Sequence, residues 1–159
     1  MKCYFICILA FLSFSCFSQG KDKFAVKNFT QIDTVEANPD YPCKYYRNLT
    51  DPSLLMKEIF WDSARSHIMS REYLKDGIHS GPCIFYTNKG DILTTGYYDN
   101  DKKDGEWIYY YYGNTKIKWE NHFNKGIKTG AWKEYDENGK LKREEIYDAV
   151  GNLKEKKTY

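Results

Sequence analysis

The chain has 159 residues, enough for one domain, and its 24 basic residues nearly balance 22 acidic ones, for a formal net charge of +2. A charge this small gives no strong electrostatic attraction to nucleic acid or to an anionic membrane. Nucleic acid is therefore excluded as an expected partner.

The first expected element is a secretory signal peptide over residues 1–18. Lys2 supplies a positive charge, the apolar run CYFICILAFLSFSCF follows, and small residues favour cleavage near Ser18. The run is too short to span a bilayer comfortably. We therefore expect a secreted, periplasmic or cell-envelope protein. In the alternative, Cys16 is lipidated and attaches the mature chain to a membrane peripherally.

Residues 19–62 show no clear repeat and are expected to form an N-terminal capping segment, because the end units of a repeat array must hide an open face. Within the segment, residues 53–61 fit either a short helix or a degenerate first strand. Cys43 lies here, and Cys83 is the second cysteine that remains after signal cleavage. In an exported protein an even pair predicts a disulfide; the alternative is two unpaired buried thiols.

Residues 63–153 are predicted to be tandem repeats. The phrases GPCIFY, GEWIYY and GAWKEY begin at Gly81, Gly105 and Gly130, with spacings of 24 and 25 residues. Their shared pattern is Gly-x-[Trp/Cys]-x-x-Tyr, and a polar turn with another glycine follows each phrase. Each phrase is therefore expected to be a strand that ends in a turn.

The segments between these phrases repeat as well: HIMSREYL, DILTTGYY, KIKWENHF and KLKREEIY. Apolar residues occupy the second and last positions, as Ile92 and Tyr98 do, and an even spacing of six places both on one face of a strand. Turns rich in Gly, Asn and Asp follow. The sequence thus predicts an all-β fold of tandem β-hairpin repeats of about 24 residues. Residues 154–159 are expected to be a polar tail.

The aromatic residues divide into two groups. Those at repeated positions are predicted to stack between neighbouring units as the repeat core: Trp107, Trp132, Tyr86, Tyr110 and Tyr135. Tyr109, Tyr111 and Tyr112 occupy positions that the repeat does not require, which makes them the candidate contact surface. A purely structural role for these three is the alternative.

No catalytic or metal-binding constellation is visible. His67 and His122 have no carboxylate or cysteine at ligand spacing, and His79 is expected to lie in a turn. There is no phosphate loop, dinucleotide fingerprint or nucleophile elbow. We therefore expect no enzymatic activity, no metal and no cofactor.

The stretches DGEWIYYYYGN, KTGAWKEYDENGKLKREEIYD and HSGPCIFYTNKGDILTTGYYD resemble MORN-type repeats, and most closely the bacterial variant in the YwqK-type antitoxin family. The copy over residues 130–148 follows the pattern almost throughout, and the copy over residues 81–99 has Cys83 in place of tryptophan. The resemblance implies hairpins joined into one elongated, curved antiparallel sheet. It also implies a scaffold or interaction role, and the antitoxin label implies a protein toxin as partner.

Together these features predict a secreted or envelope-associated repeat module that mediates protein–protein interaction, antitoxin-like by resemblance only. The alternative is a module that binds glycan or cell-wall polysaccharide through exposed aromatic side chains.

Overall fold

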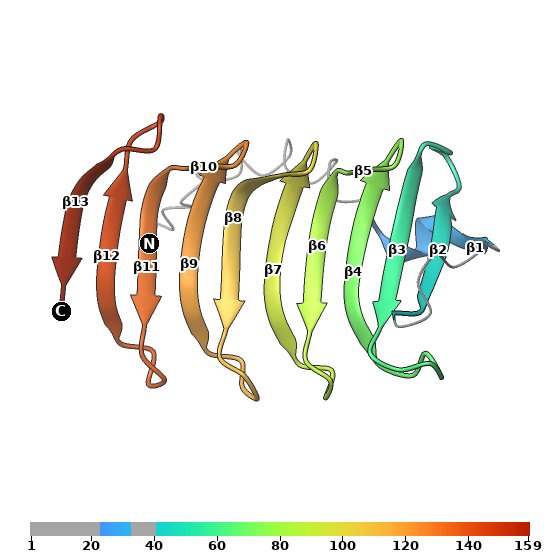
Figure 1. Cartoon of the computed structure of the whole chain (residues 1–159), viewed down its shortest axis with the longest axis horizontal. Coiled ribbons are helices and arrows are strands. Elements are labelled where there is room, and N and C mark those ends of the chain that lie inside the picture. The colour runs from blue at the N-terminus through green and yellow to red at the C-terminus, as the bar shows by residue number, and fades with distance from the viewer. Residues whose placement is uncertain (1–22, 33–40) are drawn as a thin grey trace, which may run out of the picture.

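The structure is a computed structural model that describes residues 23–32 and 41–159. The expected signal peptide over residues 1–18, including Cys16, lies outside these residues. The described chain forms one open antiparallel sheet of 13 strands, which confirms the predicted all-β fold of hairpins (Figure 1).

The elements follow one another along the chain with short connections. One 3-10 turn, η1 (Val26–Asn28), precedes the strands. The strands are β1 (Phe29–Ile32), β2 (Cys43–Asn48), β3 (Leu54–Phe60), β4 (Ile68–Lys75), β5 (Ile78–His79), β6 (Gly81–Tyr86), β7 (Ile92–Asp99), β8 (Lys102–Tyr110), β9 (Ile117–Asn124), β10 (Ile127–Lys128), β11 (Gly130–Tyr135), β12 (Leu141–Tyr147) and β13 (Leu153–Thr158).

The order of the strands in the sheet is their order in the chain. The path runs β1-β2-β3-β4-β6-β7-β8-β9-β11-β12-β13, and the short strands β5 and β10 pair with β4 and β9. Apart from β5 and β10, each strand therefore pairs only with the strands before and after it on this path, and the sheet is elongated across its strands (Figure 1).

At one end of the strands, three of the connections are two-residue turns. In each, both central residues have positive φ, the geometry of a type I′ hairpin turn. This confirms the predicted turn positions: Asp76 and Gly77 (52° and 83°), Asn100 and Asp101 (50° and 62°), and Lys125 and Gly126 (48° and 89°). Neighbouring turns are also bonded to each other, because the Asp101 N–H donates to the His79 carbonyl oxygen and the Gly126 N–H donates to that of Lys103.

Longer loops connect the strands at their other ends. In several of these loops, a side-chain oxygen accepts backbone N–H groups. The Asp136 Oδ1 accepts the backbone N–H groups of Asn138 at 2.8 Å and Lys140 at 2.9 Å. These hydrogen bonds, led by that of Lys140, hold the pKa of Asp136 below its usual value. The Thr87 hydroxyl oxygen accepts the N–H groups of Lys89 and Asp91 in the same way. Such local bonds specify where each strand ends.

A bulge recurs in every repeat hairpin. Tyr86 pairs with Ile92 and Phe85 pairs with Thr94, so one extra residue stands between Ile92 and Thr94 on β7. Equivalent register shifts occur at Phe60, Tyr110 and Tyr135. The expectation that Ile92 and Tyr98 share a face is wrong, because the bulge changes the alternation of side chains between them.

The described part of the capping segment belongs to the same sheet. Residues 54–60 form β3 rather than a helix, and the β3–β4 hairpin has the same bulge as the repeats. A core of Phe24, Leu54, Met56 and Tyr73 covers one face at this end, and the Tyr73 hydroxyl donates to the Phe24 carbonyl oxygen at 2.7 Å. The described part of the segment therefore continues the sheet at its N-terminal end and adds a small core on one face.

The expected tail over residues 154–159 is largely a strand. β13 pairs with β12 along its length, although all its side chains are exposed. Backbone hydrogen bonds suffice to place it, since an edge strand needs no buried side chain. Its lysines and glutamate protect the outer edge against pairing with another strand.

Candidate binding face

One face of the sheet gathers most of the large aromatic side chains of β6 to β12. We call it the tryptophan face. Strand register places these residues on it: Cys83, Phe85, Tyr98, Trp107, Tyr109, Trp119, Phe123, Trp132 and Tyr147. No second layer of described secondary structure covers it, because all the strands belong to one sheet.

The rings form a continuous ladder across five strands. The centroid distances are 5.1 Å for Tyr98 and Trp107, 6.4 Å for Trp107 and Phe123, 5.0 Å for Phe123 and Trp132, and 5.6 Å for Trp132 and Tyr147. Most contacts are edge-to-face, the favourable arrangement for aromatic quadrupoles, at about 0.5–1.5 kcal/mol per pair beyond area burial. The ladder joins each hairpin to the next.

The two repeat tryptophans differ in burial because their neighbours differ. Trp107 lies against Gly96 on β7 and is 2% exposed. A Cβ at Gly96 would be 2.3 Å from Trp107 Cδ2, so only glycine fits beneath the ring. At the corresponding position beside Trp132 stands Asn121, and Trp132 is half-buried. Both indole N–H groups donate to backbone carbonyl oxygens, at 3.2 Å and 2.9 Å.

The repeat core predicted from sequence is divided between the two faces. Trp107 and Trp132 lie on the tryptophan face. Tyr86, Tyr110 and Tyr135 lie on the opposite face and are half-buried, because an odd spacing of three reverses the direction of the side chain. The Tyr135 hydroxyl donates to Glu120 Oε2 at 2.8 Å, and burial followed by this bond raises the pKa of Tyr135 to about 12.

The three tyrosines predicted to form a contact surface have different surroundings. Tyr109 belongs to the tryptophan face, and its hydroxyl accepts a hydrogen bond from Lys103 Nζ at 2.8 Å. The Tyr111 hydroxyl donates to the Tyr135 carbonyl oxygen. Tyr112 is 59% exposed and donates to Asn88 Oδ1 in the preceding loop. The structure therefore does not bring the three rings together.

Lysines lie over the ladder at a repeated position. Lys103 Nζ is 4.1 Å from the centroid of Trp107, and Lys128 Nζ is 4.2 Å from that of Trp132. Neither ammonium forms an ion pair within the described residues. His79, Lys103 and Lys128 all stand two residues before a key glycine of the repeat. The position two residues before the key glycine is therefore a sequence signal for Lys103 and Lys128, although none of the motifs above included it.

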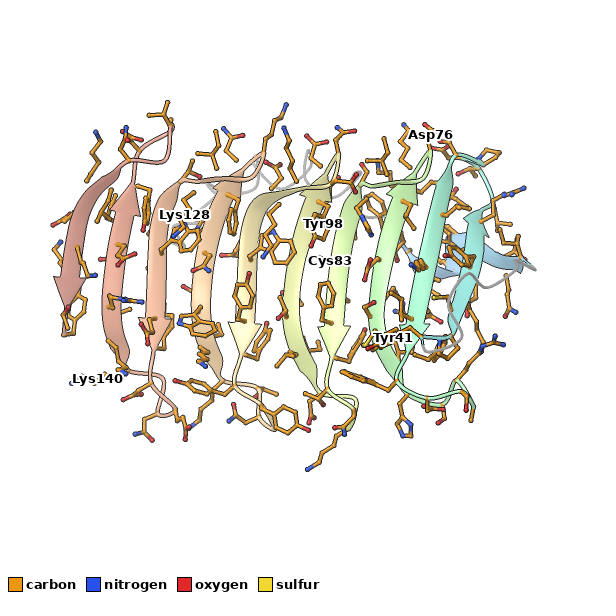
Figure 2. All side chains as sticks on the ribbon, viewed as in Figure 1. Tyr41, Asp76, Cys83, Tyr98, Lys128 and Lys140 are labelled. Carbon is orange, nitrogen blue, oxygen red and sulfur yellow. The ribbon has the colours of Figure 1, made fainter. Side chains whose placement is uncertain are left out.

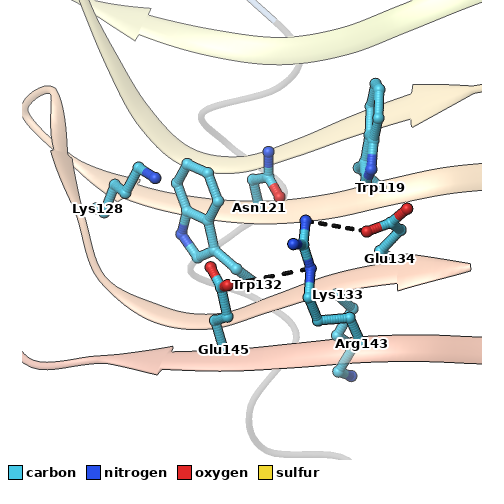
Figure 3. A pocket seen from close by; sticks show the side chains of 8 residues that line it. All are labelled: Trp119, Asn121, Lys128, Trp132, Lys133, Glu134, Arg143 and Glu145. Carbon is cyan, nitrogen blue, oxygen red and sulfur yellow. Dashed lines mark ion pairs between the residues drawn. The ribbon is translucent and has the colours of Figure 1, made fainter. Parts of the chain in front are cut away.

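A pocket of about 240 Å³ opens on the tryptophan face between β9, β11 and β12 (Figure 3). The Arg143 guanidinium lies between two glutamates, with Nη2 2.9 Å from Glu134 Oε2 and Nε 4.0 Å from Glu145 Oε1. The lining residues are Trp119, Asn121, Lys128, Trp132, Lys133, Glu134, Arg143 and Glu145. No motif predicted this pocket, because it combines residues from four strands, β9 to β12.

The cysteines do not form the predicted disulfide. Cys43 lies on β2 and Cys83 on β6, with β3 and β4 between them. Three strand spacings of about 4.8 Å separate them by roughly 14 Å, twice the usual Cα separation of a disulfide. Cys83 is 1% exposed and lies near Tyr98 (Figure 2). Burial, and then the Glu72 charge, raise the pKa of its thiol to about 12.

A hydrogen-bonded group surrounds His79, which the sequence placed in a turn without a partner. Its Nδ1 is 2.8 Å from Asp101 Oδ1 and its Nε2 is 2.8 Å from Glu72 Oε2. The Ser70 hydroxyl donates to Glu72 Oε1 at 2.7 Å, and Ser70 is 1% exposed. The group joins β4 to the next hairpin. No group of three potential metal ligands occurs in residues 23–32 and 41–159.

Comparison with protein-family models gives no match, and neither does comparison with curated proteins. The resemblance to MORN-type repeats therefore rests on the sequence motifs. The described part of the chain also has no helix long and apolar enough to cross a membrane.

Several solved structures are distantly similar to the chain. The GtfA/B complex has a TM-score of 0.42 at 12% identity over 67% of this chain and 20% of that chain. The pneumococcal O-GlcNAc transferase GtfA in complex with UDP and GlcNAc has a TM-score of 0.41 at 12% identity over 63% and 19%. TarM has a TM-score of 0.33 at 11% identity over 67% and 21%. The chain spans about a fifth of each solved chain, and similarities this distant carry no argument about function.

Proposed function

We propose that the protein is a non-catalytic interaction module that binds another protein through the tryptophan face. The observation that carries this proposal is the aromatic ladder on a face that no other described element covers. Tryptophan and tyrosine dominate the energetics of protein interfaces because they bury large, rigid surfaces. The resemblance to MORN-type repeats supports the same function.

The lysines indicate the chemistry of the partner. Lys103 and Lys128 place ammonium groups over tryptophan rings, and neither has a carboxylate partner among the described residues. A partner surface with carboxylates among apolar side chains would complement both the charge and the rings. With the proposed signal peptide over residues 1–18, this acidic partner is outside the cytoplasm or in the cell envelope.

The strand at the C-terminal edge of the sheet supports binding of a partner to the tryptophan face rather than strand addition at that edge. β13 presents Lys154, Glu155, Lys156 and Lys157 at the C-terminal edge of the sheet. Such charged side chains disfavour pairing with a strand from another protein.

Polysaccharide binding through Tyr109, Tyr111 and Tyr112 is less well supported. Their hydroxyls bond to a lysine, a backbone carbonyl and an asparagine in three different places. A flat stacking platform requires parallel neighbouring rings, and these hydrogen bonds hold the rings apart.

The test is crosslinking and affinity capture of the mature chain from its own host, compared with the double variant Lys103→Glu and Lys128→Glu. We expect one protein to be captured in stoichiometric amount by the wild type and lost with the double variant. The matched control is Lys89→Glu with Lys140→Glu, which makes the same charge change in exposed loops at the far edge. Thermal melting of all three proteins checks that the fold is intact. Equal capture by both double variants would refute the proposed face.

A further inference from the structure

The pocket between Trp119 and Trp132 has side-chain groups that the fold does not use. Within the described residues, neither the Trp119 indole N–H nor the Asn121 carboxamide has a hydrogen-bond partner. The indoles of Trp107 and Trp132 both donate to backbone carbonyls, so Trp119 is the exception among the three on this face. In Figure 3, Asn121 and Arg143 lie between the two indoles, and Lys128 lies beyond Trp132.

The acceptors in the pocket are held in place by hydrogen bonds and ion pairs. Glu145 accepts the Tyr147 hydroxyl at 2.8 Å and pairs with Lys156 at 3.1 Å, and these bonds hold its pKa below the usual value. Glu134 pairs with Arg143 at 2.9 Å. The pocket therefore offers carboxylate acceptors, an amide and N–H donors within a short distance of two aromatic rings.

The size and charge of the pocket restrict its occupant. A volume of about 240 Å³ lies below the roughly 300–1,000 Å³ of pockets for drug-sized ligands, so a single ring fits. Arg143 pairs with Glu134 and Glu145, Lys133 pairs with Glu120 at 3.8 Å, and the Lys128 ammonium lies over the Trp132 ring. A ligand with a full charge would disturb the Arg143 ion pairs, whereas hydroxyl groups can donate to the carboxylates and accept from the N–H groups without breaking them.

We propose that this pocket binds one neutral pyranose ring of a glycan. The C–H groups of a pyranose pack against indole faces, and its hydroxyls both donate and accept, which matches the Asn121 amide, the Trp119 N–H and the glutamates. An apolar side chain from a protein partner fits less well, because it would bury the Asn121 amide and the Trp119 N–H without hydrogen bonds. This site goes beyond the protein-binding function and does not depend on it.

The test is an NMR titration of the ¹⁵N-labelled protein with neutral methyl pyranosides, namely those of glucose, galactose, mannose and N-acetylglucosamine. At least one should shift the Trp119 indole N–H and the Asn121 amide signals saturably. The indole signals of Trp61 and Trp107 should stay in place, because Trp61 follows β3 far along the sheet and Trp107 is buried.

Two variants and two further probes complete the test. Asn121→Ala should weaken binding by about tenfold, the loss of one good hydrogen bond, whereas the control Trp61→Ala should leave it unchanged. Methyl glucuronide, N-acetyl-leucinamide and N-acetyl-tyrosinamide represent a charged sugar and protein side chains. The proposal is overturned if no neutral pyranoside gives a saturable shift, if Asn121→Ala binds as well as wild type, or if the amino-acid amides bind more tightly. The absence or presence of a saturable shift is decided by the wild-type titration alone. The proposal can therefore be tested even if a variant does not fold.

Discussion

The close contact between Gly96 and Trp107 makes Gly96→Ala a sharp test of the tryptophan face. The new Cβ would be 2.3 Å from Cδ2, 2.4 Å from Cε2 and 2.7 Å from Cε3 of the indole. The ring cannot simply tilt, because its N–H is bonded to Tyr97 and its edges contact Tyr98 and Phe123. We therefore expect the ring to be displaced and the sheet to lose stability.

The expected cost follows from two effects. Forcing a methyl group into a packed site costs about 1–3 kcal/mol, and losing the indole hydrogen bond adds about 1 kcal/mol. Against this, glycine to alanine in an extended strand stabilises by about 0.4–1 kcal/mol through the unfolded chain. The net expected loss is about 1–4 kcal/mol, a large share of the stability of a small domain.

Urea unfolding monitored by circular dichroism measures this loss in a double-mutant cycle with Trp107→Leu. Circular dichroism is used because Trp107→Leu itself changes the tryptophan fluorescence. In a Trp107→Leu background the shorter side chain leaves room for the methyl group, so Gly96→Ala should there be neutral or slightly stabilising. The coupling energy between the two positions should be at least as large as that loss, about 1–4 kcal/mol. A coupling energy near zero, or a stabilising Gly96→Ala in the wild type, would refute the packing of Trp107 on Gly96.

Three further predictions concern side chains of the same sheet. Trp107→Ala should cost about 3–5 kcal/mol in urea unfolding and Trp132→Ala only about 2 kcal/mol, because the second ring is half-buried; equal losses would contradict the difference in burial. The Cys83 thiol should react with iodoacetamide at neutral pH only when the protein unfolds, since its pKa is raised to about 12 and it is buried; mass spectrometry of the labelled peptide measures this. Burial raises the pKa of Tyr98 to about 12, so its contribution to stability is present below about pH 10 and lost as the pH rises to about 12. Tyr98→Phe should therefore flatten the fall of the urea midpoint over that pH range, and an unchanged fall would contradict the prediction.

The hairpin repeat could be predicted from sequence because its signals are local. The glycines at 24- and 25-residue spacing and the Asp76–Gly77 type of turn both depend on a few adjacent residues. The β3 strand could not be predicted with the same certainty, because residues 53–61 lack the local turn residues of the later copies. Its bulge at Phe60 nevertheless matches the bulges of the later hairpins.

The binding face could not be predicted because it depends on register. One extra residue at each bulge reverses the faces of all the residues before it, so counting along a strand fails across it. The burial of Trp107 depends on Gly96 in a different strand, and the pocket depends on Trp119, Trp132 and Arg143 from three strands. The contact tyrosines were predicted from one short stretch of sequence, residues 109–112, whereas the candidate pocket combines residues from several strands.

The distribution of buried side chains gives the array a direction. Every buried residue in the described chain precedes or includes Trp107, and β9 to β13 contain none. Apart from β5 and β10, each strand pairs only with the strands before and after it in the sheet, so the end with Phe24, Met56 and Tyr73 can act as a nucleus on which later hairpins add in order. The C-terminal hairpins are then the first to unfold locally. A glycan bound between β9, β11 and β12 would stabilise these hairpins against local unfolding.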